Sequence, residues 1–179
     1  SANVGETVTF TLTSPGTPVE VALFDVNVLD TVPAGLRVTG VTTNAGDLGT
    51  NATDNTSDND VDVTFDDIPA SEQGVVTITA VVENLAGTDR GDEFDNDASY
   101  TWAMTPGGAA QPAITSPQVT VTVTEPELTI TKVLDSIDMA DPAAGPQAGD
   151  TVTFTITIEH AGDSDGPVSY THLTLPTRS

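Results

Sequence analysis

One nine-residue stretch occurs twice in the chain and restricts the possible folds more than any other feature. It reads GETVTFTLT at residues 5–13 and GDTVTFTIT at residues 149–157, with seven of nine positions identical at an offset of 144 residues. Both copies alternate threonine with an apolar residue, the period-two pattern of a β-strand with one buried and one exposed face. Threonine and valine fit a pleated, half-buried surface. A strand that returns at such an offset indicates a chain cut from an array of repeats.

The rest of the chain is also predicted to be almost entirely β-structure. No segment shows a helical period, and turn residues interrupt the alternating segments at regular spacing, which favours an all-β, immunoglobulin-like Greek-key sandwich. Long polar connections are expected at residues 43–60, 87–95 and 105–117. The second copy of the repeated stretch should extend to residue 159. The other predicted strands cover residues 19–30, 36–42, 61–65, 74–83, 96–102, 118–124 and 128–134.

The same pattern divides the chain into three parts. Residues 1–124 are expected to form one repeat that lacks its first strand, and residues 125–166 the truncated start of a second repeat, beginning at Glu125-Pro126-Glu127. Residues 167–179 resemble a translated sequencing adapter, and their register departs from the first repeat, so we expect this tail to be an artefact.

The charge and composition exclude several functions. The 27 acidic residues against 4 basic ones give a net charge of −23, which disfavours nucleic acid and anionic membranes as partners. No run of 18 or more apolar residues is present, so no membrane insertion is expected in this segment. The absence of cysteine rules out disulfide bonds and thiol chemistry.

Three motifs carry a family resemblance. They are the repeated GE/DTVTFT stretch, the run VLDTVPAGL at residues 28–36 and LTITK at residues 128–132. Together they resemble the immunoglobulin-like repeats of large bacterial adhesin and fimbrial-type surface proteins, a group that includes domains of unknown function and isopeptide-forming domains. The resemblance covers nearly all of residues 1–166. It implies an extracellular, cell-surface stalk or adhesin segment whose partners are neighbouring repeats, often with a Lys–Asn crosslink inside each repeat.

Strand alternation gives an independent reason to examine three residues as crosslink candidates. Lys132 shares a strand face with Leu128, Ile130 and Leu134; Asn96 shares one with Ala98, Tyr100 and Trp102; and Asp30 ends an apolar face that starts at Ala22. Burial would favour the neutral, nucleophilic amine of a lysine and would raise the pKa of a carboxyl group. A lysine amine, an asparagine amide and a buried acid are the groups that amide exchange with loss of ammonia requires.

Other interpretations of these residues remain open. Lys132 could extend to the sheet edge and keep its charge in water, and Asn96 and Asp30 border turns where such side chains often bond the backbone. Under the family pattern, Lys132 belongs to the second repeat, whereas Asn96 and Asp30 belong to the first. Their partners would then lie outside this chain, so this fragment by itself is expected to form no crosslink.

The competing function is a Ca²⁺- or glycan-binding extracellular module that uses the acidic loops, with surface glycans or host or biofilm proteins as partners. Asp58, Asp60 and Asp62 are the candidate metal ligands, since clustered carboxylates suit Ca²⁺, although their spacing lacks the glycine and distal glutamate of an EF-hand. Apart from Ca²⁺ we expect no cofactor. We also expect no enzyme activity, because no nucleophile–base set, phosphate loop or histidine-based metal set can be assembled from the sequence.

Overall fold

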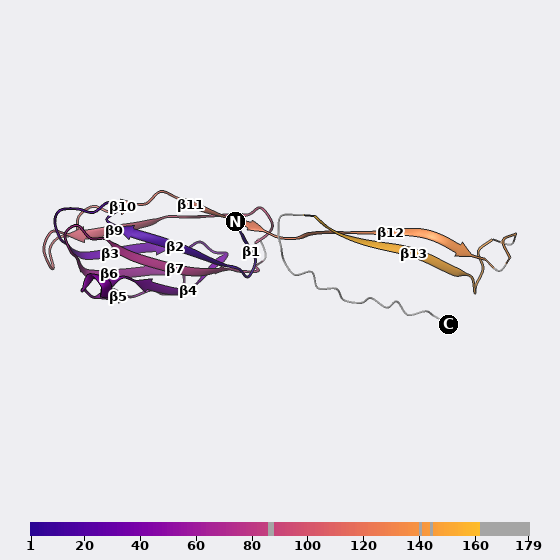
Figure 1. Ribbon diagram of the computed structural model, residues 1–179, viewed down its shortest axis with the longest axis horizontal. Helices are drawn as coiled ribbons and strands as arrows, with labels where there is room; N and C mark the ends of the chain where they lie inside the picture. Colours follow the sequence, from indigo (N-terminus) through magenta and orange to yellow (C-terminus); the bar gives the residue numbers. More distant parts are fainter. Residues whose placement is uncertain (86–87, 140, 144, 162–179) are drawn as a thin grey trace. The chain divides into compact units, whose positions relative to one another are not determined.

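The computed structural model describes residues 1–85, 88–139, 141–143 and 145–161, and divides the chain into two compact units, Ser1–Thr124 and Glu125–Ser179 (Figure 1). Within this described part, no helix is long and apolar enough to cross a membrane. Residues 162–179, which include the whole tail predicted to be an artefact, lie outside it.

The described residues of the first unit form eleven strands and one short helix, in agreement with the predicted all-β class. In chain order these are β1 (Ala2–Asn3), β2 (Thr7–Ser14), β3 (Leu23–Thr31), β4 (Leu36–Thr43), α1 (Ala45–Leu48), β5 (Ala52–Asp54), β6 (Asp60–Ile68), β7 (Gly74–Val82), β8 (Glu93–Asn96), β9 (Ala98–Ala103), β10 (Ile114–Thr115) and β11 (Val119–Thr124).

These strands form an immunoglobulin-like β-sandwich, which confirms the predicted fold class. One layer is a five-stranded sheet in the order β10-β9-β3-β6-β5, and two three-stranded sheets, β2-β7-β4 and β1-β11-β8, complete the sandwich (Figure 1). The alternating sequences of β6 and β7 fill the core, where Val63, Phe65, Val76 and Ile78 are fully buried. The core is therefore built mainly from aliphatic side chains, as the low aromatic content of the sequence requires.

The alternation of β3 is interrupted by a bulge. Asp25 has a left-handed φ of 48° and the pairing register shifts between Phe24 and Asn27. The predicted apolar face from Ala22 through Phe24 is therefore wrong at its start, because the bulge turns Leu23 inward instead. After the bulge, Val26, Val28 and Asp30 point into the core as predicted.

The start of the predicted strand 96–102 also differs from expectation. The chain passes from one sheet to another at Asp97, so Asn96 ends β8 while Ala98 begins β9 in the five-stranded sheet. Both residues are buried, but they do not belong to one continuous strand face. The polar segment 43–60, predicted to be a loop, holds α1 and β5, and residues 93–95, also predicted to be a loop, belong to β8.

The second unit is an antiparallel ribbon of β12 (Glu127–Asp138) and β13 (Thr151–Ala161). β13 is the second copy of β2 in the sequence, since Thr151 corresponds to Thr7 at the 144-residue offset. One face of the ribbon carries threonines and the other carries apolar residues. That apolar face is exposed and includes Leu128, Ile130, Leu134, Val152, Phe154, Ile156 and Ile158.

Candidate functional site

The first unit buries one polar pair in its core. Asp30 on β3 is 3% exposed and Asn96 at the end of β8 is 2% exposed, and Asn96 Nδ2 donates a 2.9 Å hydrogen bond to Asp30 Oδ2. The two residues are 66 positions apart in the chain and come from different sheets. The alternative in which each side chain bonds the backbone of its own turn is therefore not what the structure shows, because the side chains bond each other.

The hydrogen-bonding capacity of the Asp30–Asn96 pair is only half satisfied. Asp30 Oδ1 and Asn96 Oδ1 are both buried, and neither has a hydrogen-bond partner among the described residues. A buried polar atom without a partner costs about 1–3 kcal/mol, so such atoms are rare in folded proteins and call for an explanation. Both atoms are acceptors, so a donor group such as an amine or ammonium would satisfy them.

Burial changes the acidity of Asp30. Removal from water raises the pKa of its carboxyl group above the ordinary aspartate value; the hydrogen bond from Asn96 lowers it in part, and the nearby charge of Asp97 raises it further. The protonated form of Asp30 is therefore favoured over a wider pH range than that of an exposed aspartate. A carboxyl group of this kind can give and take protons beside the Asn96 amide.

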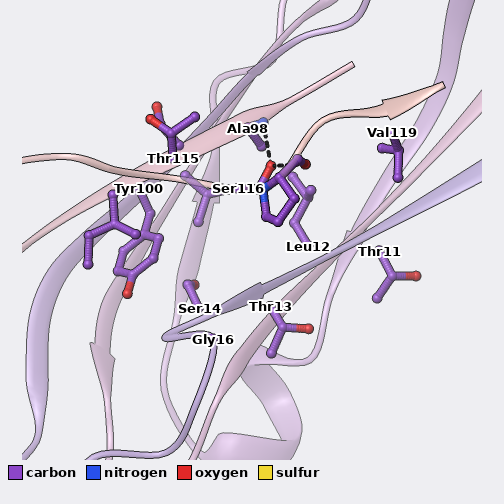
Figure 2. A pocket seen from close by; sticks show the side chains of 14 residues that line it. Thr11, Leu12, Thr13, Ser14, Gly16, Ala98, Tyr100, Thr115, Ser116 and Val119 are labelled. Atoms are coloured by element: carbon purple, nitrogen blue, oxygen red, sulfur yellow. Dashed lines mark hydrogen bonds between the residues drawn. The ribbon is translucent and has the colours of Figure 1, made fainter. Parts of the chain in front are cut away.

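Two adjoining hollows lie beside the pair. One, of about 270 Å³, is lined by residues 9–12 of β2 together with Asn96, Ser116 and Val119. The other, of about 440 Å³, shares Leu12, Ser116 and Val119 and extends to Tyr100, as Figure 2 shows. We call these two hollows together the β2–β11 groove. Asn96 therefore lines a groove between two strands, although its own side chain is nearly inaccessible.

The structure places Lys132 in the second unit, apart in sequence from the other two candidates. Lys132 pairs with Ile156 across the ribbon, and its Nζ lies 4.0 Å from the centroid of the Phe154 ring, a cation–π contact. The side chain therefore lies on the apolar face of β12, as the alternation predicts. The ribbon leaves this face exposed, so Lys132 is not buried here.

Two of the three predicted Ca²⁺ ligands lie in β6 and make ordinary polar contacts. Asp62 accepts a 2.6 Å hydrogen bond from Asn27 Nδ2, and Asp60 accepts one of 3.0 Å from the hydroxyl of Thr31. Nowhere in the described ranges do three or more histidine, cysteine, aspartate or glutamate side chains gather as a group that could hold a metal ion. Ca²⁺ binding through Asp58, Asp60 and Asp62 stays a prediction.

Sequence reasoning did not find the groove itself. Its residues Ser116 and Val119 carry no reactive group and lie far from β2 in the chain. A signal was nonetheless present in the repeated stretch, because its second copy, β13, pairs with β12, whereas among the described residues β2 pairs with β7 alone.

Comparisons with known proteins give structural likenesses only. No family model matches the chain, and no curated protein matches its sequence. The collagen-binding subdomain ACE19 of the Enterococcus faecalis surface protein ACE is 17% identical, with a TM-score of 0.47 over 69% of this chain and 90% of that one.

Two pilins are also similar. Domains D2 and D3 of the major pilin SpaD from Corynebacterium diphtheriae are 17% identical (TM-score 0.47; 84% of this chain, 54% of that one). The D312A form of BcpA, the major pilin subunit of Bacillus cereus, is 13% identical (TM-score 0.49; 88% of this chain, 56% of that one). This chain thus spans about half the length of each pilin structure. Its structural neighbours are an adhesin subdomain and major pilin domains of bacteria.

Proposed function

We propose that the chain is part of a non-enzymatic stalk or adhesive segment of an extracellular bacterial surface protein, built from tandem sandwiches. We further propose that each complete repeat closes itself with an amide bond between a β12-type lysine and an asparagine equivalent to Asn96. The observation that carries the proposal is the buried Asp30–Asn96 pair, with its two unpartnered oxygens, in the wall of the β2–β11 groove.

The internal repeat supports a lysine at this position. In the second unit Lys132 lies opposite Ile156, and the 144-residue offset makes Ile156 the counterpart of Leu12. Leu12 lines the same hollow as Asn96. A strand with the register of β12 laid along β2 would therefore bring its lysine to the part of the groove that Asn96 lines.

The chemistry needs no co-reactant. The neutral lysine amine attacks Cγ of the asparagine, the new C–N bond forms, the bond from Cγ to Nδ2 breaks, and ammonia leaves. Asp30 takes a proton from the attacking nitrogen and delivers one to the departing nitrogen, so it ends in its starting state. Atoms and protons balance, and nothing is oxidised or reduced.

Such a bond suits a load-bearing role. The chain has no cysteine, so disulfides cannot hold the sandwich closed. An amide between the β12-type strand that begins the repeat and β8 would covalently join two segments that are far apart in the chain. In a tandem array, tension would then pass through a closed covalent loop and would not depend on hydrogen bonds alone.

The test is a single complete repeat made from this chain, with residues 125–157 joined directly to residues 14–124. The join follows the repeat offset, since Thr157 is the counterpart of Thr13, and it places Lys132, Asp30 and Asn96 in one unit. We expect an intact mass lower than calculated by one ammonia. Lys132→Met and Asn96→Ala should each restore the calculated mass. A full mass in the unmodified repeat, when it is shown to be folded by circular dichroism, would overturn the crosslink.

A further inference from the structure

The motif VLDTVPAGL at residues 28–36 supplies Asp30, and it also supplies a glycine that contacts the strand of Asn96. β3 and β4 are joined by a turn that contains Gly35, whose φ of +105° is a backbone conformation in which any other residue is strained. The carbonyl oxygen of Gly35 accepts a 2.8 Å hydrogen bond from Glu83 N, so the turn is tied to the chain that follows β7.

Gly35 leaves room for the ring of Phe94. A Cβ added to Gly35 would lie 2.5 Å from Cε1 and 3.2 Å from Cε2 of that ring. Non-bonded carbon atoms pack at about 3.5–4 Å, so a residue with a side chain cannot occupy this position unless the ring moves. Phe94 itself is partly buried and packs against the hydrophobic core. The missing side chain of Gly35 therefore sets how closely the ring approaches the turn.

The same two segments meet twice. Phe94 and Asn96 are alternate residues of β8, so their side chains point to the same side of the strand. Asp30 lies near the end of β3, and Gly35 lies in the turn that follows it. β8 therefore meets the β3–β4 segment through the hydrogen bond from Asn96 to Asp30 and again through the contact of Phe94 with Gly35.

The second contact matters because β8 is short and belongs to a different sheet from β3. Among the described residues the ladder partner of β8 is β11, whereas Asp30 lies in the five-stranded sheet. On the C-terminal side of Asn96, Ala98 pairs with Asp30 and holds the chain to β3. On its N-terminal side no such pairing is described, and the Phe94–Gly35 contact holds β8 against the turn.

We infer that Gly35 and Phe94 are positioning residues for Asn96. The Phe94 ring rests on the backbone of Gly35 and holds β8 at the distance from β3 at which Asn96 reaches Asp30. The inference deepens the proposed function and rests on it for its chemical meaning, because the amide held in place is the one that the lysine would attack. A misplacement of about 1 Å in a reacting group can slow a reaction about a hundredfold.

The first experiment measures the Asn96–Asp30 contact in the full chain, where no crosslink is expected. NMR follows hydrogen exchange of the Asn96 Nδ2 amide, which the buried hydrogen bond protects. Urea titration of each variant gives the part of any faster exchange that a loss of global stability explains. We expect exchange in Gly35→Ala to exceed that part by about tenfold or more. Adding Phe94→Leu to this variant removes the clashing ring carbons and should slow the exchange again.

Gly74→Ala is the matched control. Its added Cβ would also meet a core side chain, at 2.7 Å from Ile68 Cδ1, but neither residue lines the hollow that Asn96 lines. Exchange at Asn96 in this variant should not exceed the part that stability explains, because distant sites act independently. Exchange that follows global stability in both glycine variants would overturn the inference. So would a double variant that exchanges as fast as Gly35→Ala.

A further variant covers the case in which Gly35→Ala does not fold. Phe94→Leu alone keeps the glycine and removes the ring, so its exchange at Asn96 should also exceed the part that stability explains. Exchange no faster than that part would overturn the role of the Phe94 ring.

The rate at which the complete repeat loses ammonia is a separate readout. Gly35→Ala should slow this loss about tenfold or more relative to Gly74→Ala, and equal rates in the two variants would count against the positioning role. An unmodified repeat that folds but keeps its ammonia would overturn the proposed crosslink. The exchange rates in the full chain would still decide whether Gly35 and Phe94 position Asn96.

Discussion

Replacing Asn96 with alanine tests whether the buried pair has the energetics that the structure implies. In the full chain, Asn96 Nδ2 is the donor to a carboxyl group that is 3% exposed and has no other side-chain partner among the described residues. A hydrogen bond to a charged group contributes about 1.5–3 kcal/mol, and water cannot readily replace the lost donor at a buried position. We therefore expect Asn96→Ala to lower the free energy of unfolding by about 2–3 kcal/mol at neutral pH.

The chain provides a matched control for this change. Asn51 Nδ2 donates a 3.0 Å hydrogen bond to Asp66 Oδ2, the same pair of groups at an exposed position. Asn51→Ala should change stability by no more than about 0.5 kcal/mol, because water replaces the lost partner. Urea unfolding followed through Trp102, the single tryptophan, measures both variants. Equal losses for the two variants would refute the reasoning, since burial is the difference between the sites.

The same variant has a predicted pH dependence. The stability lost in Asn96→Ala should shrink as the pH falls through the raised pKa of Asp30, because a protonated carboxyl group no longer carries a buried charge. A deficit that stayed constant from neutral pH down to the ordinary aspartate range would show that the loss comes from packing and not from the carboxylate.

Three further predictions address the site, the core and the acidic loop. Burial raises the pKa of Asp30 in the folded state, so the folded chain holds this proton more tightly than the unfolded chain. The free energy of unfolding should therefore fall as the pH rises from the ordinary aspartate pKa through the raised one. Asp30→Asn should remove this pH dependence, as measured by urea titrations at a series of pH values. Gly74→Ala should cost about 1–3 kcal/mol in the same assay, since the added Cβ would lie 2.7 Å from Ile68 Cδ1, whereas Gly40→Ala, with nothing within 4 Å, should be nearly neutral. If the aspartates at residues 58–62 bind Ca²⁺, millimolar Ca²⁺ should raise the melting temperature above that in a chelator; an unchanged melting temperature would dispose of the site.

Much of the fold follows from local alternation. The alternation of threonine with apolar residues predicted β2 and its copy β13. The same alternation predicted that Asp30 and Lys132 lie on the apolar faces of their strands, which is where the structure has them. These features are local, because side-chain direction in a strand depends on position along that strand. The bulge at Asp25 could not be foreseen from parity, since one residue in the left-handed region reverses the faces before it.

The meeting of Asp30 and Asn96 depends on long-range pairing that no local pattern contains. Asn96 reaches Asp30 because the chain changes sheets at Asp97, which joins a strand paired with β11 to one paired with β3. That β2 pairs only with β7 among the described residues is likewise a property of the assembled sheets. Sequence alone therefore indicated inward-facing side chains, but not which of them touch.

The central claim is that the Asp30–Asn96 pair is a crosslinking site completed by a β12-type lysine. Peptide mapping by mass spectrometry of the complete repeat, residues 125–157 joined to 14–124, tests it most directly. The account predicts one branched peptide that joins Lys132 to Asn96 with loss of one ammonia. It also predicts a stabilisation on the order of 4 kcal/mol over the Lys132→Met repeat, by analogy with a covalent bond that closes a loop of roughly 100 residues. A folded repeat that yields only linear peptides, or a branch at a residue other than Asn96, would contradict the account.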